Sequence, residues 1–290
     1  MKGPAHKGGR LAAALIAALS LASSASAQGK SAQSHGKGKG PSSTGLPAPT
    51  AVAAPSGATP FAWIDDASLV EPHSVWVGFS TLRWQGSGLS EVSIPIIDVA
   101  VGIAPRLQVG ANVPRATDRT DQGGGPGGLG TTYFNAKIGV SQNERIKFAV
   151  APTMEVLPST AVEGTDVNRV QWGLPVSIEA EHGRGRVYGG AGYFSRGVWY
   201  AGGGLALQLS ARLVGSCSFS RAWASTPIED PALAAPSRND LSGGASFALT
   251  PTVGVFGSIG STIATAEEHG AGTTFSIGLS VAFRPVLTTK

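Results

Sequence analysis

The chain has 290 residues with a formal net charge of +4, and only 14% of them are charged. Six of the 22 Lys and Arg precede residue 61, so the remainder carries 16 of them against all 18 Asp and Glu. This remainder lacks the excess of basic residues that a nucleic-acid-binding surface needs, and we expect no nucleic-acid partner. The single cysteine, Cys217, excludes an internal disulfide framework and a cysteine-based metal cluster. We expect neither a metal nor a cofactor.

The N-terminal region has the three parts of a secretory signal. A basic stretch is followed by the apolar run Leu11 to Leu21 and by the small-x-small pattern Ala25-Ser26-Ala27. The apolar run is too short to span a membrane as a helix, so residues 1–27 are predicted to be a signal peptide. Residues 28–60 consist mainly of Ser, Gly, Ala, Pro and Lys, a composition that predicts a disordered linker.

The remaining residues, 61–290, repeat one pattern of alternating apolar and small or polar residues, then a turn. The clearest example is Val170 to Glu181, in which every even position is apolar and every odd one is Gln, Gly, Pro, Ser or Glu. A β-strand points successive side chains to opposite faces, so each such segment has one apolar and one polar face. No later stretch holds 18 uninterrupted apolar residues, which argues against a membrane-spanning helix.

Twelve strands are predicted from this alternation. Every second connection is very short, and the connections between them are mostly longer, although 86–90 and 196–197 break the trend. Long loops on one side and tight turns on the other, with an even strand number, are typical of outer-membrane barrels. The predicted strands are 72–85, 91–103, 106–114, 131–141, 146–156, 168–182, 185–195, 198–209, 211–222, 240–249, 252–263 and 273–284.

The polar faces are composed mostly of Gly, Ser and Ala, which suit a narrow barrel interior better than a solvent-exposed surface. We therefore predict an all-β fold, a closed antiparallel transmembrane β-barrel of about 12 strands with its apolar face toward lipid and a disordered N-terminal extension. Closure pairs every backbone group, which a membrane requires. Pro95, Pro152 and Pro175 each remove a ladder donor inside a strand, so a bulge or local opening is expected at each.

Two groups of side chains invite a functional interpretation. Aromatic residues near strand ends are candidates for interface girdles, with individual packing as the alternative: Trp76, Trp84, Trp172, Trp199, Tyr200 and Trp223. Alternation also predicts polar side chains lining one wall of the lumen: Asp98, Gln108, Asn112, Asn135, Lys137, Lys147, Glu155, Gln171, Glu179 and Glu181. One hypothesis makes this wall a polar track for a solute. The other makes it a salt-bridge ladder that fills the lumen.

Three stretches resemble a known family. Asp98 to Pro114 is similar to its strand–tight turn–strand hairpin, and Gly127 to Gly139 to its Gly-rich loop leading into a strand with a central lysine, here Lys137. Phe148 to Pro158 fits its next strand. Together they resemble outer-membrane barrels of the meta-pathway phenol-degradation transporter type. The resemblance implies movement of small, often apolar or aromatic molecules. Such barrels commonly end on an aromatic residue read by the assembly machinery, whereas seven residues follow Phe283 here.

These observations predict a passive channel or facilitator in the bacterial outer membrane rather than an enzyme. Its expected partners are the lipid bilayer, the outer-membrane assembly machinery and a small-molecule solute. One alternative is a structural or adhesion barrel that acts through loops 115–130 and 223–239. Another is an outer-membrane lipid hydrolase, but neither His182 nor His269 has a neighbouring serine in a recognisable nucleophile motif, and the adjacent His73 and Ser74 would point to opposite faces of a strand.

Overall fold

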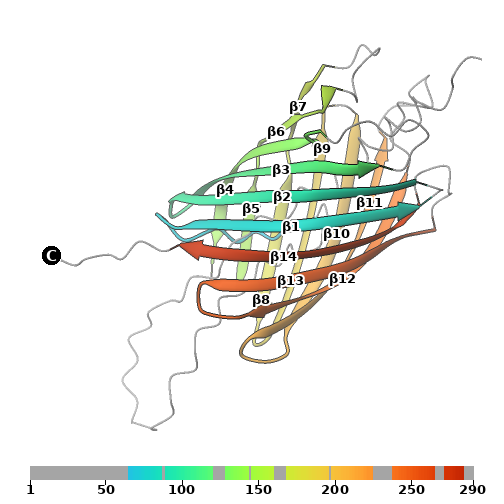
Figure 1. Cartoon of the computed structure of the whole chain (residues 1–290). Helices are drawn as coiled ribbons and strands as arrows, with labels where there is room; N and C mark the ends of the chain where they lie inside the picture. Colours follow the sequence, from blue (N-terminus) through green and yellow to red (C-terminus); the bar gives the residue numbers. More distant parts are fainter. Residues whose placement is uncertain are drawn as a thin grey trace, which may run out of the picture.

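The computed structural model describes residues 65–86, 89–119, 128–143, 145–159, 168–195, 197–224, 237–264 and 271–283. These residues form one antiparallel sheet that closes on itself into a barrel (Figure 1). None of them belongs to a helix of the length and apolarity needed to cross a membrane. The predicted signal peptide and linker lie outside the described residues, as do most residues of the two loops proposed for adhesion.

Within these ranges the barrel wall is built from fourteen strand segments. They are β1 (Val75–Gly86), β2 (Leu89–Ala104), β3 (Leu107–Arg119), β4 (Thr132–Gln142), β5 (Ile146–Val150), β6 (Thr153–Val156), β7 (Val170–Gly173), β8 (Val176–His182), β9 (Gly185–Phe194), β10 (Val198–Gln208), β11 (Leu213–Ala224), β12 (Arg238–Ala248), β13 (Val253–Ile263) and β14 (Thr273–Phe283). β5 and β6 both pair with β4, and β7 and β8 both pair with β9, so each pair is one interrupted strand. The wall therefore has twelve strands, as predicted.

The seam of the barrel joins its first and last strands. β1 pairs with β14 over its whole length, from Val75 opposite Phe283 to Gln85 opposite Thr273. The other edge of β1 pairs with β2, so no strand edge stays open at the seam. Closure satisfies the backbone donors and acceptors that hydrocarbon would otherwise leave unpaired.

The apolar face of the strands points outward. On β14, Phe275 and Ile277 are 57% and 64% exposed, whereas Ser280 and Ala282 on the opposite face are buried. The other strands follow the same rule, and Cys217 lies on the outer face of β11 next to the exposed Phe219, as its position in the alternation predicts. An outward apolar surface with small polar residues inside is the reverse of a soluble barrel and fits a bilayer.

Tight turns join β2 to β3, β4 to β5, β8 to β9, β10 to β11 and β12 to β13. All five lie at the end of the barrel where β1 begins and β14 ends. Outer-membrane barrels carry short turns on the periplasmic side, so we orient this end toward the periplasm.

The prolines interrupt the ladder as predicted. Near Pro95 the registers of β2 with both its neighbours shift, and Ile94 and Pro95 are both exposed between the buried Ser93 and Ile96. This bulge moves the lumen-facing positions of β2 from odd to even numbers. Pro152 separates β5 from β6, and Pro175 separates β7 from β8. The two breaks lie side by side on neighbouring strands, because Val150 is the register partner of Val176 and Thr153 is the register partner of Gly173.

Residues 65–74 precede the first strand and enter the barrel. The prediction started that strand at residue 72, but β1 begins at Val75, after a turn in which the Ser74 amide donates to the Glu71 carbonyl at 3.0 Å. The chain crosses the rim at Gly102, where an added Cβ would lie only 2.1 Å from the Glu71 oxygen. Beyond this crossing Asp66 to Val70 are all buried. We call Asp65–Val70 the inner segment.

Candidate functional site: the lumen and its wall

The polar residues predicted from the alternation lie on β2 to β8, on the inner side of the wall. Buried among them are Asp98, Gln108, Asn112, Lys137, Lys147, Glu155 and Glu179, whereas Asn135, Gln171 and Glu181 are partly exposed. At mid-height the Asn112 amide donates to the Asp98 carboxylate, and the Tyr133 hydroxyl donates to Glu155 at 3.0 Å. Gln171 accepts a 2.6 Å hydrogen bond from the Ser195 hydroxyl. Their role toward a solute remains a prediction.

Part of this wall is a salt-bridge ladder across two paired strands. Lys147 on β5 lies directly opposite Glu179 on β8 in the register. The Lys147 ammonium is 3.2 Å from a Glu179 oxygen and 2.7 Å from a Glu181 oxygen. Glu181 follows Glu179 by two residues, so both carboxylates share the lumen face of one strand.

The inner segment lies on the cationic part of the same wall. The Lys137 ammonium is 3.0 Å from an Asp65 oxygen and 3.5 Å from an Asp66 oxygen, and it also donates to the Asp66 carbonyl. A guanidinium nitrogen of Arg186, on β9, is 2.9 Å from Asp66.

Further contacts fix the rest of the inner segment. The Ser68 hydroxyl lies 2.9 and 2.8 Å from the two Glu179 oxygens, so it donates to this carboxylate, and it accepts a hydrogen bond from the Lys147 ammonium on β5 at 3.0 Å. The Val70 amide donates to the Gln108 side chain at 2.8 Å, and the Gln142 side chain donates to the Ala67 carbonyl at 3.0 Å. The hydrogen bonds and ion pairs described here join the inner segment to β3, β4, β5, β8 and β9. These strands are neighbours in the wall, so the segment runs along its inner face close to the short-turn end.

The opposite wall, β11 to β14, is lined by serines and glycines. The Ser218 and Ser242 hydroxyls are 2.8 Å apart across β11 and β12, and those of Ser258 and Ser276 are 2.8 Å apart across β13 and β14. Hydroxyls that bond to one another across neighbouring strands form a neutral, narrow surface. The lumen thus has one wall rich in charged side chains and one wall lined mainly by hydroxyls and glycines, on which Arg238 and Asp240 of β12 form an ion pair.

Three aromatic side chains cluster inside the barrel nearer the long-loop end. Tyr133 and Phe194 have ring centroids 6.3 Å apart, and Phe194 and Tyr200 are 6.1 Å apart. All three are buried, and they form one cluster with Val198 and Ala222. We call Tyr133, Phe194 and Tyr200 the aromatic bar. Tyr133 lies on β4 and Phe194 on β9, strands that are not neighbours in the wall, so the bar narrows the interior.

Glycines make room for these rings against the wall. A Cβ added at Gly173 would lie 2.4 Å from the Phe194 ring, and one added at Gly192 would lie 2.6 Å from the Tyr200 ring. The same relation holds between Gly204 and Tyr188, at 2.6 Å. Part of the glycine content of the inner face is thus explained by aromatic rings that lie flat on it.

The prediction of aromatic interface girdles is wrong for three of its six residues. Trp76, Trp84 and Tyr200 are buried inside the barrel. Trp172 and Trp199 do face outward, and both contact Tyr193, with ring centroids 5.7 and 4.9 Å away. Trp223 is the register partner of Trp199 and is partly exposed. These outward rings form a patch on the long-loop half of β7, β9, β10 and β11, where a membrane interface favours them.

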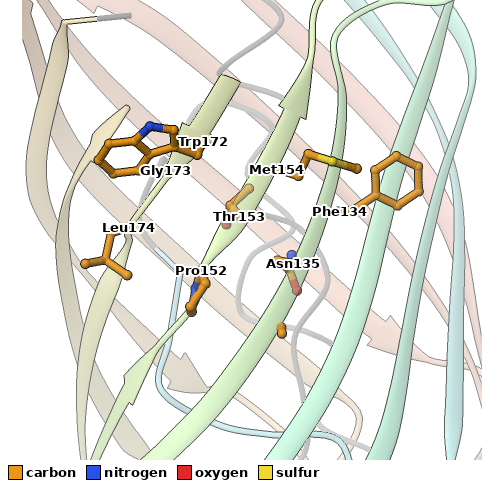
Figure 2. A pocket seen from close by; sticks show the side chains of 9 residues that line it. Phe134, Asn135, Pro152, Thr153, Met154, Trp172, Gly173 and Leu174 are labelled. Atoms are coloured by element: carbon orange, nitrogen blue, oxygen red, sulfur yellow. The ribbon is translucent and has the colours of Figure 1, made fainter. Parts of the chain in front are cut away.

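A pocket opens on the outer surface where the two proline breaks face each other (Figure 2). Its volume is about 490 Å³. Its lining is Phe134, Asn135, Ala136, Pro152, Thr153, Met154, Trp172, Gly173 and Leu174. Figure 2 shows Trp172 and Leu174 on one side of Pro152 and Thr153, and Phe134 with Met154 on the other. Phe194 of the aromatic bar lies directly behind Gly173, so at this point only one strand separates the lumen cluster from the pocket.

Several lumen residues were missed from the sequence. The Arg238–Asp240 pair, 2.8 Å apart on β12, could have been assigned by parity, whereas the glycine-rich strand of Arg186 has no clear apolar face. Asp65 and Asp66 carried no such signal, because they lie outside any strand. Of the histidines considered for a hydrolase, His182 is exposed at the end of β8 and His73 is exposed in the rim turn, while His269 lies outside the described residues.

Comparisons with known proteins identify the fold. No protein family and no curated protein matches the sequence. Among solved structures, the COG4313 outer membrane channel from Pseudomonas putida F1 is similar with a TM-score of 0.56 and 11% identity, over 75% of this chain and 98% of that one. The NanC porin is similar with a TM-score of 0.53 and 8% identity, over 71% and 98% of the two chains. With its outward apolar face, the chain is a bacterial outer-membrane β-barrel.

Proposed function

We propose that the barrel is a passive channel for small apolar or aromatic molecules, of the meta-pathway phenol-degradation transporter type, and that such molecules leave it through its wall. The observation that carries this proposal is the apolar pocket at the paired proline breaks. Pro152 and Pro175 have no N–H to donate, so the ladder between the interrupted strands is weakest there. Strand separation costs least at this position.

The lumen supplies a path to this point. An apolar solute entering from the long-loop end meets the aromatic bar, which offers ring surfaces for stacking. Phe194 lies against Gly173, and the outer side of the same strand borders the pocket with Trp172 and Leu174. A molecule that displaces the Phe194 ring therefore has the shortest way to hydrocarbon through this part of the wall.

Energetics favour an exit into lipid over an exit into the periplasm. Moving an aromatic ring of benzene size from water into hydrocarbon is favourable by about 2–3 kcal/mol. The inner segment, in contrast, occupies the short-turn end with charged and hydrogen-bonded groups. The wall route thus combines the lower barrier with the more favourable destination.

Uptake of radiolabelled toluene by cells with an intact lipopolysaccharide layer tests the proposal. Ala136→Trp puts a large ring into the pocket from the outer face of β4, and we expect the channel-dependent uptake to fall several-fold. Ala245→Trp on the outer face of β12 is the control, because Ala245 is an outward-facing alanine far from the breaks in strand order. Ion conductance in planar bilayers should be the same for both variants, since ions do not leave through the wall.

Two results would count against it. Equal toluene uptake by cells with Ala136→Trp and cells with Ala245→Trp would contradict the proposed exit through the wall. If cells with the unmodified protein took up toluene no faster than cells without it, the proposal that the channel carries apolar molecules would be wrong.

A further inference from the structure

A buried cationic site lies in the lumen, and the protein fills it with its own carboxylates. Lys137 is fully buried, and the side chain of Arg186 is 13% exposed. They come from β4 and β9, and both reach Asp66, while Lys137 also holds Asp65. Charges buried to this extent are stable only with a counter-charge, so the site requires an anion whenever it is closed to water.

The Asp65–Asp66 pair that occupies this site resembles a small dianion covalently attached to the protein. Asp65 and Asp66 are consecutive residues, and their two carboxylates bind two different cations. Their attachment to the wall continues through Ser68, which bonds to Glu179 and Lys147, and through Val70, which bonds to Gln108, but Asp65 and Asp66 are the only charged residues of the inner segment. The two aspartates therefore supply the electrostatic part of the docking, and the remainder of the inner segment positions them.

The charge of the region changes sign when the segment leaves. Among the described ion pairs, Lys137, Lys147 and Arg186 face Glu179, Glu181 and the two aspartates, a net charge of −1. Without Asp65 and Asp66 the same region has a net charge of +1. An undocked segment would leave a cationic constriction that attracts anions.

We propose that Asp65 and Asp66 are a tethered ligand of a lumenal anion site made by Lys137 and Arg186. A soluble dicarboxylate that takes this site releases the inner segment and opens the short-turn end of the barrel. The site is separate from the wall pocket, and the proposal does not depend on an apolar cargo.

Hydrogen exchange of the full mature protein in detergent micelles measures the release directly, with succinate as the probe. The Val70 amide is protected by its bond to Gln108, so exchange over residues 65–70 reports docking. We expect succinate to accelerate this exchange by about tenfold or more, relative to sodium chloride at the same ionic strength. Unchanged exchange at saturating succinate would refute competition for the site.

Conductance tests the consequence of release. Asp65→Asn combined with Asp66→Asn keeps the size of both side chains and removes their charge, so we expect faster exchange over 65–70 and a several-fold higher conductance without succinate. Asp240→Asn is the matched control, because it removes a lumenal carboxylate that pairs with Arg238 rather than with the inner segment. It should leave both readouts unchanged.

Replacement of residues 65–70 by a Gly/Ser stretch of equal length separates blockage from charge. Conductance equal to that of the unmodified protein would show that the segment does not close the short-turn end. If the double Asn variant does not refold, the succinate titration of the unmodified protein still decides whether the site binds an anion. Toluene uptake is read independently, so a failure here leaves the wall route standing.

Discussion

Replacing Glu179 by Ala separates the two hypotheses for the charged wall. Glu179 is 1% exposed and has three described partners: the Ser68 hydroxyl, Lys147 at 3.2 Å and Arg186 at 3.8 Å. Removing one member of a buried charged network costs about 3–5 kcal/mol when it leaves a charge uncompensated. Here Lys147 retains Glu181 and Arg186 retains Asp66, so the lower end of the range, about 3 kcal/mol, is expected.

Two companion variants calibrate this value. Glu179→Gln keeps an acceptor for Ser68 and loses only the charge, which should cost about 1–2 kcal/mol. Glu181→Ala removes a carboxylate whose side chain is 30% exposed, so a cost of about 1 kcal/mol or less is expected. The order of the three costs follows from the burial of the two carboxylates and from the acceptor that Gln keeps, and does not depend on their absolute size.

Urea unfolding of the protein refolded into lipid vesicles gives the three free energies, and planar-bilayer recordings give conductance and ion selectivity. A large loss of stability in Glu179→Ala with unchanged conductance would mean that the wall is a structural ladder. If Glu179→Ala and Glu181→Ala instead differed by less than about 0.5 kcal/mol, burial would not determine the cost and our reasoning would be wrong.

Two further outcomes are expected. Gly173→Val, whose Cβ would meet the Phe194 ring at 2.4 Å, should destabilise the barrel by about 1–3 kcal/mol in urea unfolding, whereas Gly243→Val, whose Cβ would meet Ser216 at 3.8 Å, should not. Because Cys217 faces lipid, it should react with the apolar N-phenylmaleimide but resist a charged maleimide in intact vesicles. Rapid reaction with the charged reagent would show that Cys217 does not face lipid.

The strands were predictable because alternation is a strong signal in this chain. β13 and β14 were predicted to within one residue at each end, since Phe275, Ile277 and Leu279 alternate with small residues without interruption. The ladder breaks at Pro152 and Pro175 were predictable for a simple chemical reason, the missing N–H. That the two breaks face each other required the register, which the sequence alone does not specify.

Other parts of the site had weaker signals or none. Trp76 and Trp84 were misassigned because their position near strand ends was given more weight than their parity, which correctly points them inward. Arg186 was missed because its strand is so rich in glycine that neither face reads as apolar. The inner segment was beyond prediction, since Asp66 meets Arg186 across 120 positions of sequence and no local pattern encodes that contact.

The inner segment also bears on how such a barrel is assembled. It runs directly into β1, the strand that later completes the seam with β14, while its described partners stand on β3, β4, β5, β8 and β9. During assembly, a partial wall made of these strands would therefore curve around the inner segment before β10 to β14 are added. The contacts of the inner segment would then have two roles. They would first set the curvature of the wall, and afterwards hold the segment at the short-turn end of the lumen.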